Sequence, residues 1–82
     1  MKREKYEFKI GTLTRTLEVE RFEWGVRVTK SDKPKDAIRT YYEIRNFRLT
    51  KKYPTIEANV KRSLSYFKYY KFNKQEKMLL LC

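Results

Sequence analysis

The spacing of apolar residues changes along the chain from every second position to every third or fourth, and this change constrains the fold most. Between residues 6 and 30 apolar side chains largely alternate with polar ones, a period of two that is typical of half-buried strands. After Pro54 the spacing is that of one helix face, with apolar residues at positions 56, 60, 64 and 67. We therefore predict an α+β fold in which an antiparallel sheet of about four strands packs one face against one C-terminal helix.

The first thirty residues are expected to form an antiparallel meander. Gly11 and Thr12 fit a two-residue hairpin loop that pairs Ile10 with Leu13, because glycine readily adopts the positive φ of a type II′ turn. The face of the first strand then continues along the second and is interrupted at Arg15. The favoured interpretation is that Arg15 pairs with a carboxylate at the rim of the sheet. Two alternatives are that its side chain points outward to solvent or that it lines a groove.

The second turn of the meander has three possible forms. After position 19 the apolar residues switch from odd to even numbers, and a two-residue turn at Glu20 and Arg21 explains the switch. A bulge near Arg21, or a wider loop that uses Gly25, explains it as well. The pairs created by the two-residue turn are Val19 with Phe22, Leu17 with Trp24 and Leu13 with Val28, and Trp24 is then expected in the core.

The segment between the meander and the helix is predicted to hold a loop and a fourth strand. Residues 31–36 are polar around Pro34 and read as the loop, and alternation resumes at Ile38. The apolar positions then shift parity between Ile44 and Phe47, which indicates a bulge or a tight hairpin near Asn46.

The helix is predicted to run from Thr55 to about Tyr70, with Thr55 as its N-cap and Glu57 in the first turn, where a carboxylate suits the helix dipole. Phe67 and Tyr70 are expected to face the sheet. The residues expected on the opposite side are Lys61, Arg62, Ser65, Lys68 and Tyr69. The apolar end, residues 78–82, is expected either to pack back onto the sheet or to form a contact with a partner.

Composition argues against catalysis. A chain of 82 residues makes one domain, residues 1–82, and it has no histidine and one cysteine, Cys82. The glutamates near the second turn and the two aspartates lack the clustering that a metal site needs. We expect a non-enzymatic protein without cofactor or metal, soluble and cytoplasmic, with no membrane partner.

The charge points to an anionic partner. The net charge is +11, of which residues 45–82 contribute +8 and residues 1–44 contribute +3. Such a field favours encounter with nucleic acid or an acidic protein surface. We predict a binding protein that contacts nucleic acid, or a nucleoprotein complex, through its second half, and a homodimer is left open. The candidate residues are Arg45, Arg48, Lys51, Lys52, Lys61, Arg62, Lys68, Tyr69 and Lys71.

The stretch "YPTIEANVKRSL", after "YYEIRNF", resembles a group of small phage and mobile-element proteins with three or four strands and one C-terminal helix. Tyr53, Thr55, Ile56 and Glu57 match the group's Tyr-x-Thr-aliphatic-Glu helix start, and the basic tail from Lys68 departs from it. The resemblance implies a host-takeover context. The alternative function is therefore inhibition of a host defence effector, of anti-CRISPR type, by docking on an acidic or nucleic-acid-binding groove.

Overall fold

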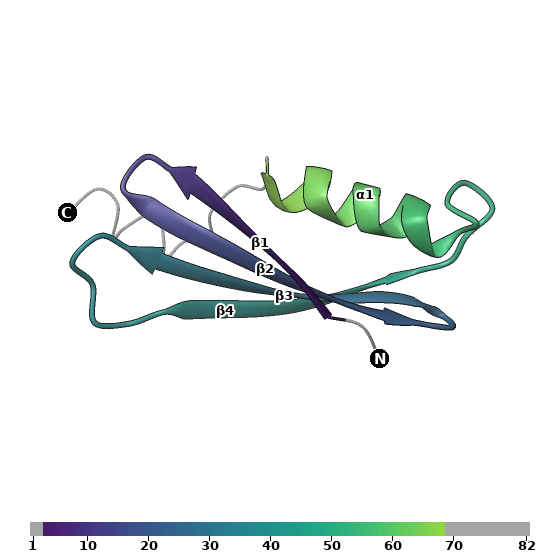
Figure 1. The fold of residues 1–82 in the computed structure, drawn as a ribbon, viewed down its shortest axis with the longest axis horizontal. Helices are drawn as coiled ribbons and strands as arrows, with labels where there is room; N and C mark the ends of the chain where they lie inside the picture. Colours follow the sequence, from purple (N-terminus) through teal and green to yellow (C-terminus); the bar gives the residue numbers. More distant parts are fainter. Residues whose placement is uncertain (1–2, 69–82) are drawn as a thin grey trace.

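The computed structural model describes residues 3–68 and confirms the predicted α+β class. One antiparallel sheet has the strand order β1-β2-β3-β4, so that neighbours in sequence are neighbours in space (Figure 1). The strands are β1 (Arg3–Ile10), β2 (Leu13–Phe22), β3 (Gly25–Pro34) and β4 (Tyr41–Arg48), and one helix follows, α1 (Ile56–Lys68).

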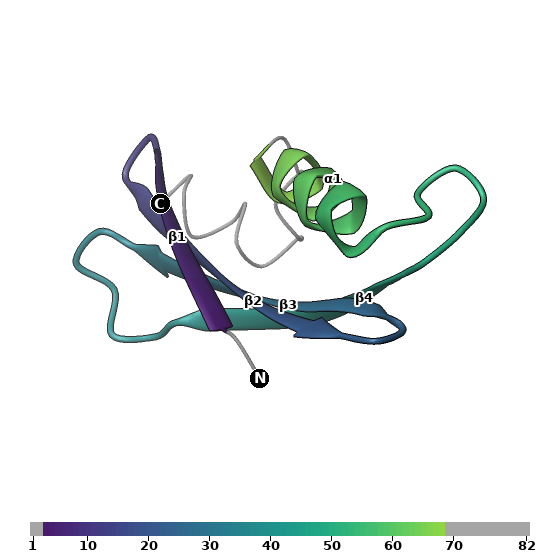
Figure 2. The same ribbon diagram turned by 45° about the vertical axis from the view of Figure 1, so that its right-hand side comes forward.

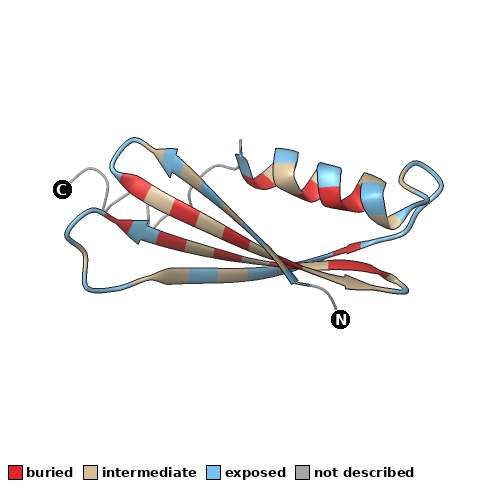
Figure 3. Cartoon of the chain, viewed as in Figure 1, coloured by how far each residue is buried: buried red, intermediate tan, exposed pale blue. Residues whose placement is uncertain are grey.

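The helix covers one face of the sheet. Figure 2 shows α1 above the strands, and we call the face turned away from it the open face. Buried and partly exposed residues alternate along β2 and β3 (Figure 3), as the period of two predicts. The buried apolar residues that form the core between sheet and helix are Leu17, Val19, Val26, Val28, Phe47, Val60 and Phe67.

The helix begins as predicted. The Ala58 backbone N–H donates to Thr55 Oγ1 at 3.0 Å, so Thr55 is the N-cap and satisfies one of the first free donors. Val60 and Phe67 are buried against the sheet, and Ile56 and Leu64 pack at its margin. The predicted helix end at Tyr70 lies outside the described residues.

The first hairpin is also confirmed. Ile10 pairs with Leu13 across the turn. Gly11 has a φ of 60°, and Thr12 is not among the residues with positive φ. That combination matches the predicted type II′ turn, which needs positive φ at its first central position alone.

The predicted second turn was wrong. Phe22 pairs with Gly25, so the turn consists of Glu23 and Trp24, and Val19 pairs with Val28. A Cβ atom on Gly25 would lie 2.1 Å from the backbone oxygen of Phe47, and the φ of Gly25 is 145°. Glycine is therefore required where β3 begins beside β4. As a result Trp24 is half-buried in the turn and not in the core.

The predicted loop at residues 31–36 was wrong in its first part. β3 continues to Pro34, opposite Leu13, and the Lys35 N–H still donates to the Thr12 carbonyl at 2.9 Å. The polar residues of this segment form strand because their partners in β2 include Arg15, which is polar too. Proline is tolerated at the end of the strand, where the ladder stops.

The fourth strand is shorter and more regular than predicted. It begins at Tyr41, and Ile38 is fully exposed in the preceding loop. The pairing with β3 is continuous from Tyr41 to Arg48, without a bulge or a hairpin at Asn46. The parity shift has a different cause: Phe47 faces the core, whereas Ile44 faces solvent on the open face.

Arg15 belongs to a buried charge cluster and not to the rim of the sheet. Its guanidinium donates to both carboxylate oxygens of Asp32, at 2.7 and 2.8 Å, and all these side chains are fully buried. Lys30 Nζ donates to the same carboxylate at 2.5 Å, and Arg15 Nη1 donates to the Phe67 carbonyl at 2.7 Å. The cluster thus ties β2, β3 and the last turn of α1 together through charge-assisted hydrogen bonds.

We predict that Asp32→Asn destabilises the fold by about 3 to 5 kcal/mol, because it removes the buried negative charge to which Arg15 and Lys30 donate. The measurement is urea unfolding followed by circular dichroism. Asp36→Asn is the matched control, since Asp36 is exposed and has a φ of 62°, which asparagine also adopts. Equal stability of the two variants would contradict the cluster's role.

Candidate nucleic-acid interface

One end of the molecule gathers cations from four separate segments. The start of β3 after the β2–β3 turn, the end of β4, the loop after it and the first turns of α1 meet there (Figure 1), and the Leu49 N–H donates to the Trp24 carbonyl at 3.0 Å. We call this surface the basic end. Its cations are Arg27, Arg48, Lys51, Lys52, Lys61 and Arg62.

Aromatic rings hold two of these arginines. The rings of Phe22 and Trp24 stack, with centroids 4.9 Å apart and planes 8° from parallel. The Arg48 guanidinium lies 4.8 Å from the Trp24 ring centroid, and that of Arg27 lies 5.3 Å from the Phe22 centroid. Such cation–π contacts restrict the long side chains while leaving the N–H edges of a guanidinium able to donate.

A tight loop presents the lysines. The Thr50 N–H donates to the Tyr53 carbonyl at 2.9 Å, and the Tyr53 N–H donates to Thr50 Oγ1 at 3.0 Å. These bonds close the loop that carries Lys51 and Lys52, both exposed. Lys52 Nζ lies 5.6 Å from the centroid of the Tyr53 ring.

Arg62 was predicted to point outward with the other helix cations, but it lies across the loop and the edge of the core. Its guanidinium is 4.3 Å from the Tyr53 centroid and 5.2 Å from that of Phe47. Nη2 donates to the Arg48 carbonyl at 3.1 Å and also to Asn59 Oδ1. Arg62 therefore joins α1 to the end of β4, and its loss would disturb the fold as well as the charge.

A shallow groove runs beside these residues. Its lining comes from β4, the following loop and α1, namely Arg45, Asn46, Phe47, Arg48, Thr50 and Arg62. A second shallow depression adjoins it across Arg62 and is lined by Tyr53, Ala58, Lys61 and Ser65. The cations thus border two open concave surfaces and not an enclosed pocket.

The structure brings together five of the predicted residues, Arg48, Lys51, Lys52, Lys61 and Arg62, and separates others. Arg45 lines the same shallow groove as Arg48 and Arg62, but from the helix-facing side of β4, with its guanidinium 4.8 Å from the Tyr66 centroid. Lys68 is in the last turn of α1, far along the helix from Lys61. Tyr69 and Lys71 lie outside the described residues.

Three residues of this end were missed in the sequence. Trp24 was expected in the core, Phe22 was only paired with Val19, and Arg27 was not singled out. The available signal was Gly25, because a glycine directly after Glu23 and Trp24 is typical of a turn at those two residues. A tryptophan in a turn is placed at the surface, where it can hold arginines.

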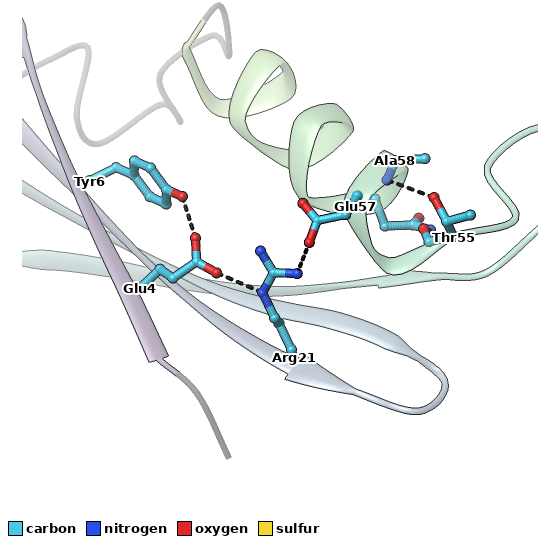
Figure 4. A network of polar contacts seen from close by, with 7 residues as sticks. Glu4, Tyr6, Arg21, Thr55, Glu57 and Ala58 are labelled. Atoms are coloured by element: carbon cyan, nitrogen blue, oxygen red, sulfur yellow. Dashed lines mark hydrogen bonds and ion pairs between the residues drawn. The ribbon is translucent and has the colours of Figure 1, made fainter.

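A polar network orients the start of α1 relative to the sheet. Figure 4 shows Arg21 of β2 between two carboxylates: its Nε donates to Glu4 at 2.6 Å, and its Nη1 donates to Glu57 in the first turn of α1. Tyr6 donates to Glu4 from the other side. The network fixes the helix that carries Lys61, and it also engages Glu57 in the first turn of that helix, whereas Glu23 in the β2–β3 turn is an exposed acid at the basic end.

The network shifts the pKa values of its members. The hydrogen bond from Arg21 lowers the pKa of Glu57 below its ordinary value of 4.5, because it favours the ionised carboxylate. The hydrogen bond that Tyr6 gives to Glu4 raises the pKa of the Tyr6 hydroxyl, and burial adds to this effect. The contribution of the Glu57 contact to stability is therefore present above pH 4.5 and is lost as the pH falls through the lowered pKa.

We predict that Arg21→Gln raises the pKa of Glu57 toward its ordinary value, since the hydrogen bond that holds the carboxylate ionised is removed. The measurement is an NMR titration of the Glu57 side-chain carboxyl carbon. Arg3→Gln is the matched control, because Arg3 pairs with Glu20 at 3.5 Å and does not touch the network. An unchanged Glu57 pKa in Arg21→Gln would show that the two side chains are not paired in solution.

Neither a metal-ligand cluster nor a membrane-spanning helix is found between residues 3 and 68. No cluster of three or more potential metal-ligating His, Cys, Asp or Glu side chains occurs in this range. No helix in it combines the length and the apolar character that a membrane crossing requires.

No protein-family model, curated protein or solved structure matches the chain. The resemblance to small phage proteins therefore stays a prediction.

Proposed function

We propose that the protein binds nucleic acid through the basic end, with phosphate contacts and surface shape contributing more than recognition of bases. The observation that supports this most is the interleaving of cations from four segments with the rings of Phe22, Trp24 and Tyr53. A cytoplasmic location and a phage or mobile-element origin belong to the same proposal.

Preorganisation is the physical argument. A free arginine loses much rotamer freedom when it binds a phosphate, whereas Arg27 and Arg48 are already restrained by the rings beneath them. The rings of Phe22 and Trp24 lie beneath the guanidinium groups, and the N–H edges are the part of arginine that binds phosphate oxygens. Arginines restrained in this way lose less side-chain entropy on binding a phosphate, an advantage that solubility alone does not require.

The opposite end of the sheet provides a comparison. It also carries lysines around a shallow depression, namely Lys9, Lys33 and Lys35. The lining of that depression includes Asp36 and no aromatic residue. Of the two ends, the one with ring-held arginines fits a polyanion better.

We predict a steep dependence of affinity on salt. If the basic end neutralises about five phosphates, the logarithm of the association constant for duplex DNA should fall with the logarithm of salt concentration at a slope of roughly −4.5. Fluorescence anisotropy with generic duplex and single-stranded DNA and RNA measures it. Absence of binding at low salt would refute the proposal, and retention of a host protein from nuclease-treated lysate would then favour the inhibitor alternative.

The location of the site is tested by two double variants of equal charge. Lys51→Glu with Lys52→Glu should weaken binding more than tenfold, because both side chains are exposed at the basic end. Lys33→Glu with Lys35→Glu changes the net charge equally at the other end, where both lysines are also exposed. Equal losses of affinity in the two double variants would mean that net charge alone drives binding. A larger loss in Lys33→Glu with Lys35→Glu would place the binding site at the opposite end of the sheet.

A further inference from the structure

The two edges of the sheet differ in what they present to solvent. On the open face of β1 the residues are all charged, Arg3, Lys5, Glu7 and Lys9, a pattern that discourages pairing with another chain. On the open face of β4, Tyr42 is 69% exposed and Ile44 is 64% exposed. Its pairing with β3 is unbroken, and it contains neither a bulge nor a proline. Within residues 3–68, β4 is thus an edge strand whose open face is more apolar than that of β1.

The hydrogen-bond pattern shows which backbone groups of β4 point outward. The Leu49 N–H donates to the Trp24 carbonyl, so this pair, which continues the β3–β4 register, is a hydrogen-bonded one. In an antiparallel ladder such pairs alternate with non-bonded ones. The odd-numbered residues of β4 therefore bond to β3, and Tyr42, Ile44 and Asn46 direct their N–H and C=O groups to the open edge.

We propose that a second copy of the chain pairs with this edge, so that two β4 strands run antiparallel around a two-fold axis at Ile44 and the two sheets become one. Ile44 then faces the partner's Ile44 in a hydrogen-bonded pair, on the open face. The other cross-strand pairs join Glu43 to the partner's Arg45, Tyr42 to the partner's Asn46, and Tyr41 to the partner's Phe47. Such an interface is self-complementary, as two-fold symmetry requires.

Charge disfavours the two neighbouring symmetric registers and favours this one. An axis at Glu43 would place two glutamates face to face, and an axis at Arg45 would place two arginines face to face. Like charges directly opposite are destabilising. With the axis at Ile44, each Glu43 meets an Arg45 in a non-hydrogen-bonded pair, where side chains come closest. Within one chain Arg45 Nε lies 3.9 Å from Glu43 Oε2.

The dimer and the proposed nucleic-acid site respond oppositely to salt. Each chain carries a net charge of +11, so two chains repel each other, and salt screens that repulsion. Dimerisation should therefore strengthen as salt rises, while binding of nucleic acid weakens. Pairing also engages Arg45, Asn46 and Phe47, which line the shallow groove of the basic end, whereas Lys51 and Lys52 lie beyond the paired residues.

Sedimentation velocity over a range of protein and salt concentrations tests the dimer. A dimer of the unmodified chain should become detectable as the protein concentration is raised to about 1 mM. At a given protein concentration, the dimer fraction should be larger at higher salt. Ile44→Lys should be monomeric, because it puts two cations at the axis. Ile38→Lys adds the same charge at a fully exposed position outside β4 and should still dimerise. A monomeric unmodified chain at every concentration, or dimers of Ile44→Lys, would overturn the proposal.

Cysteine cross-linking in a Cys82→Ser background tests the register. Cα atoms of a hydrogen-bonded antiparallel pair lie about 5.5 Å apart, within reach of a disulfide. Ile44→Cys should cross-link to itself on mild oxidation. Tyr42→Cys and Asn46→Cys should each fail alone and cross-link when mixed. Self-cross-linking of Asn46→Cys without that of Ile44→Cys would exclude the axis at Ile44.

Discussion

The buried pairing of Arg15 with Asp32 is the interaction on which the other parts of the structure depend. Two cations and one carboxylate are fully enclosed, and the Arg15 guanidinium also binds a carbonyl in the last turn of α1. Because a buried charge is tolerated only with its partners in place, the cluster permits one register of β2 against β3 and one position of the helix end. The register brings the turn at Glu23 and Trp24 to the basic end.

The sequence predicted the faces of the elements better than the pairing between them. The type II′ turn, the N-cap and the buried side of α1 followed from residue type and period. The register of β2 with β3 did not follow from them. The predicted and observed pairings differ by six positions, an even number, so each residue stays on the same face of the sheet in both. An apolar pattern cannot distinguish such registers. The deciding constraints were the close approach of Gly25 to Phe47 and the buried pair, neither of which has an apolar signature.

The candidate site was predicted in part for a similar reason. Runs of lysine and arginine are visible in sequence, so Lys51, Lys52 and Lys61 were found. What a cation touches is not visible: Arg62 binds the β4 end, and Arg45 lies over Tyr66 on the other side of the strand. The stacked rings of Phe22 and Trp24, which contact Arg27 and Arg48, were missed because their position depends on the register of β2 with β3. Charge alone predicted a region, and tertiary contacts defined the surface.

The two proposals combine into one geometry. With the axis at Ile44, Arg48 of one chain lies opposite position 40 of its partner, eight strand residues from the partner's Arg48, or about 26 Å along the strands. The two basic ends therefore cannot share one phosphate, but a nucleic acid long enough to reach both would be held twice. Such bivalent binding raises affinity through effective concentration. It would make long nucleic acids a better ligand than short ones, even though each basic end makes the same contacts with both.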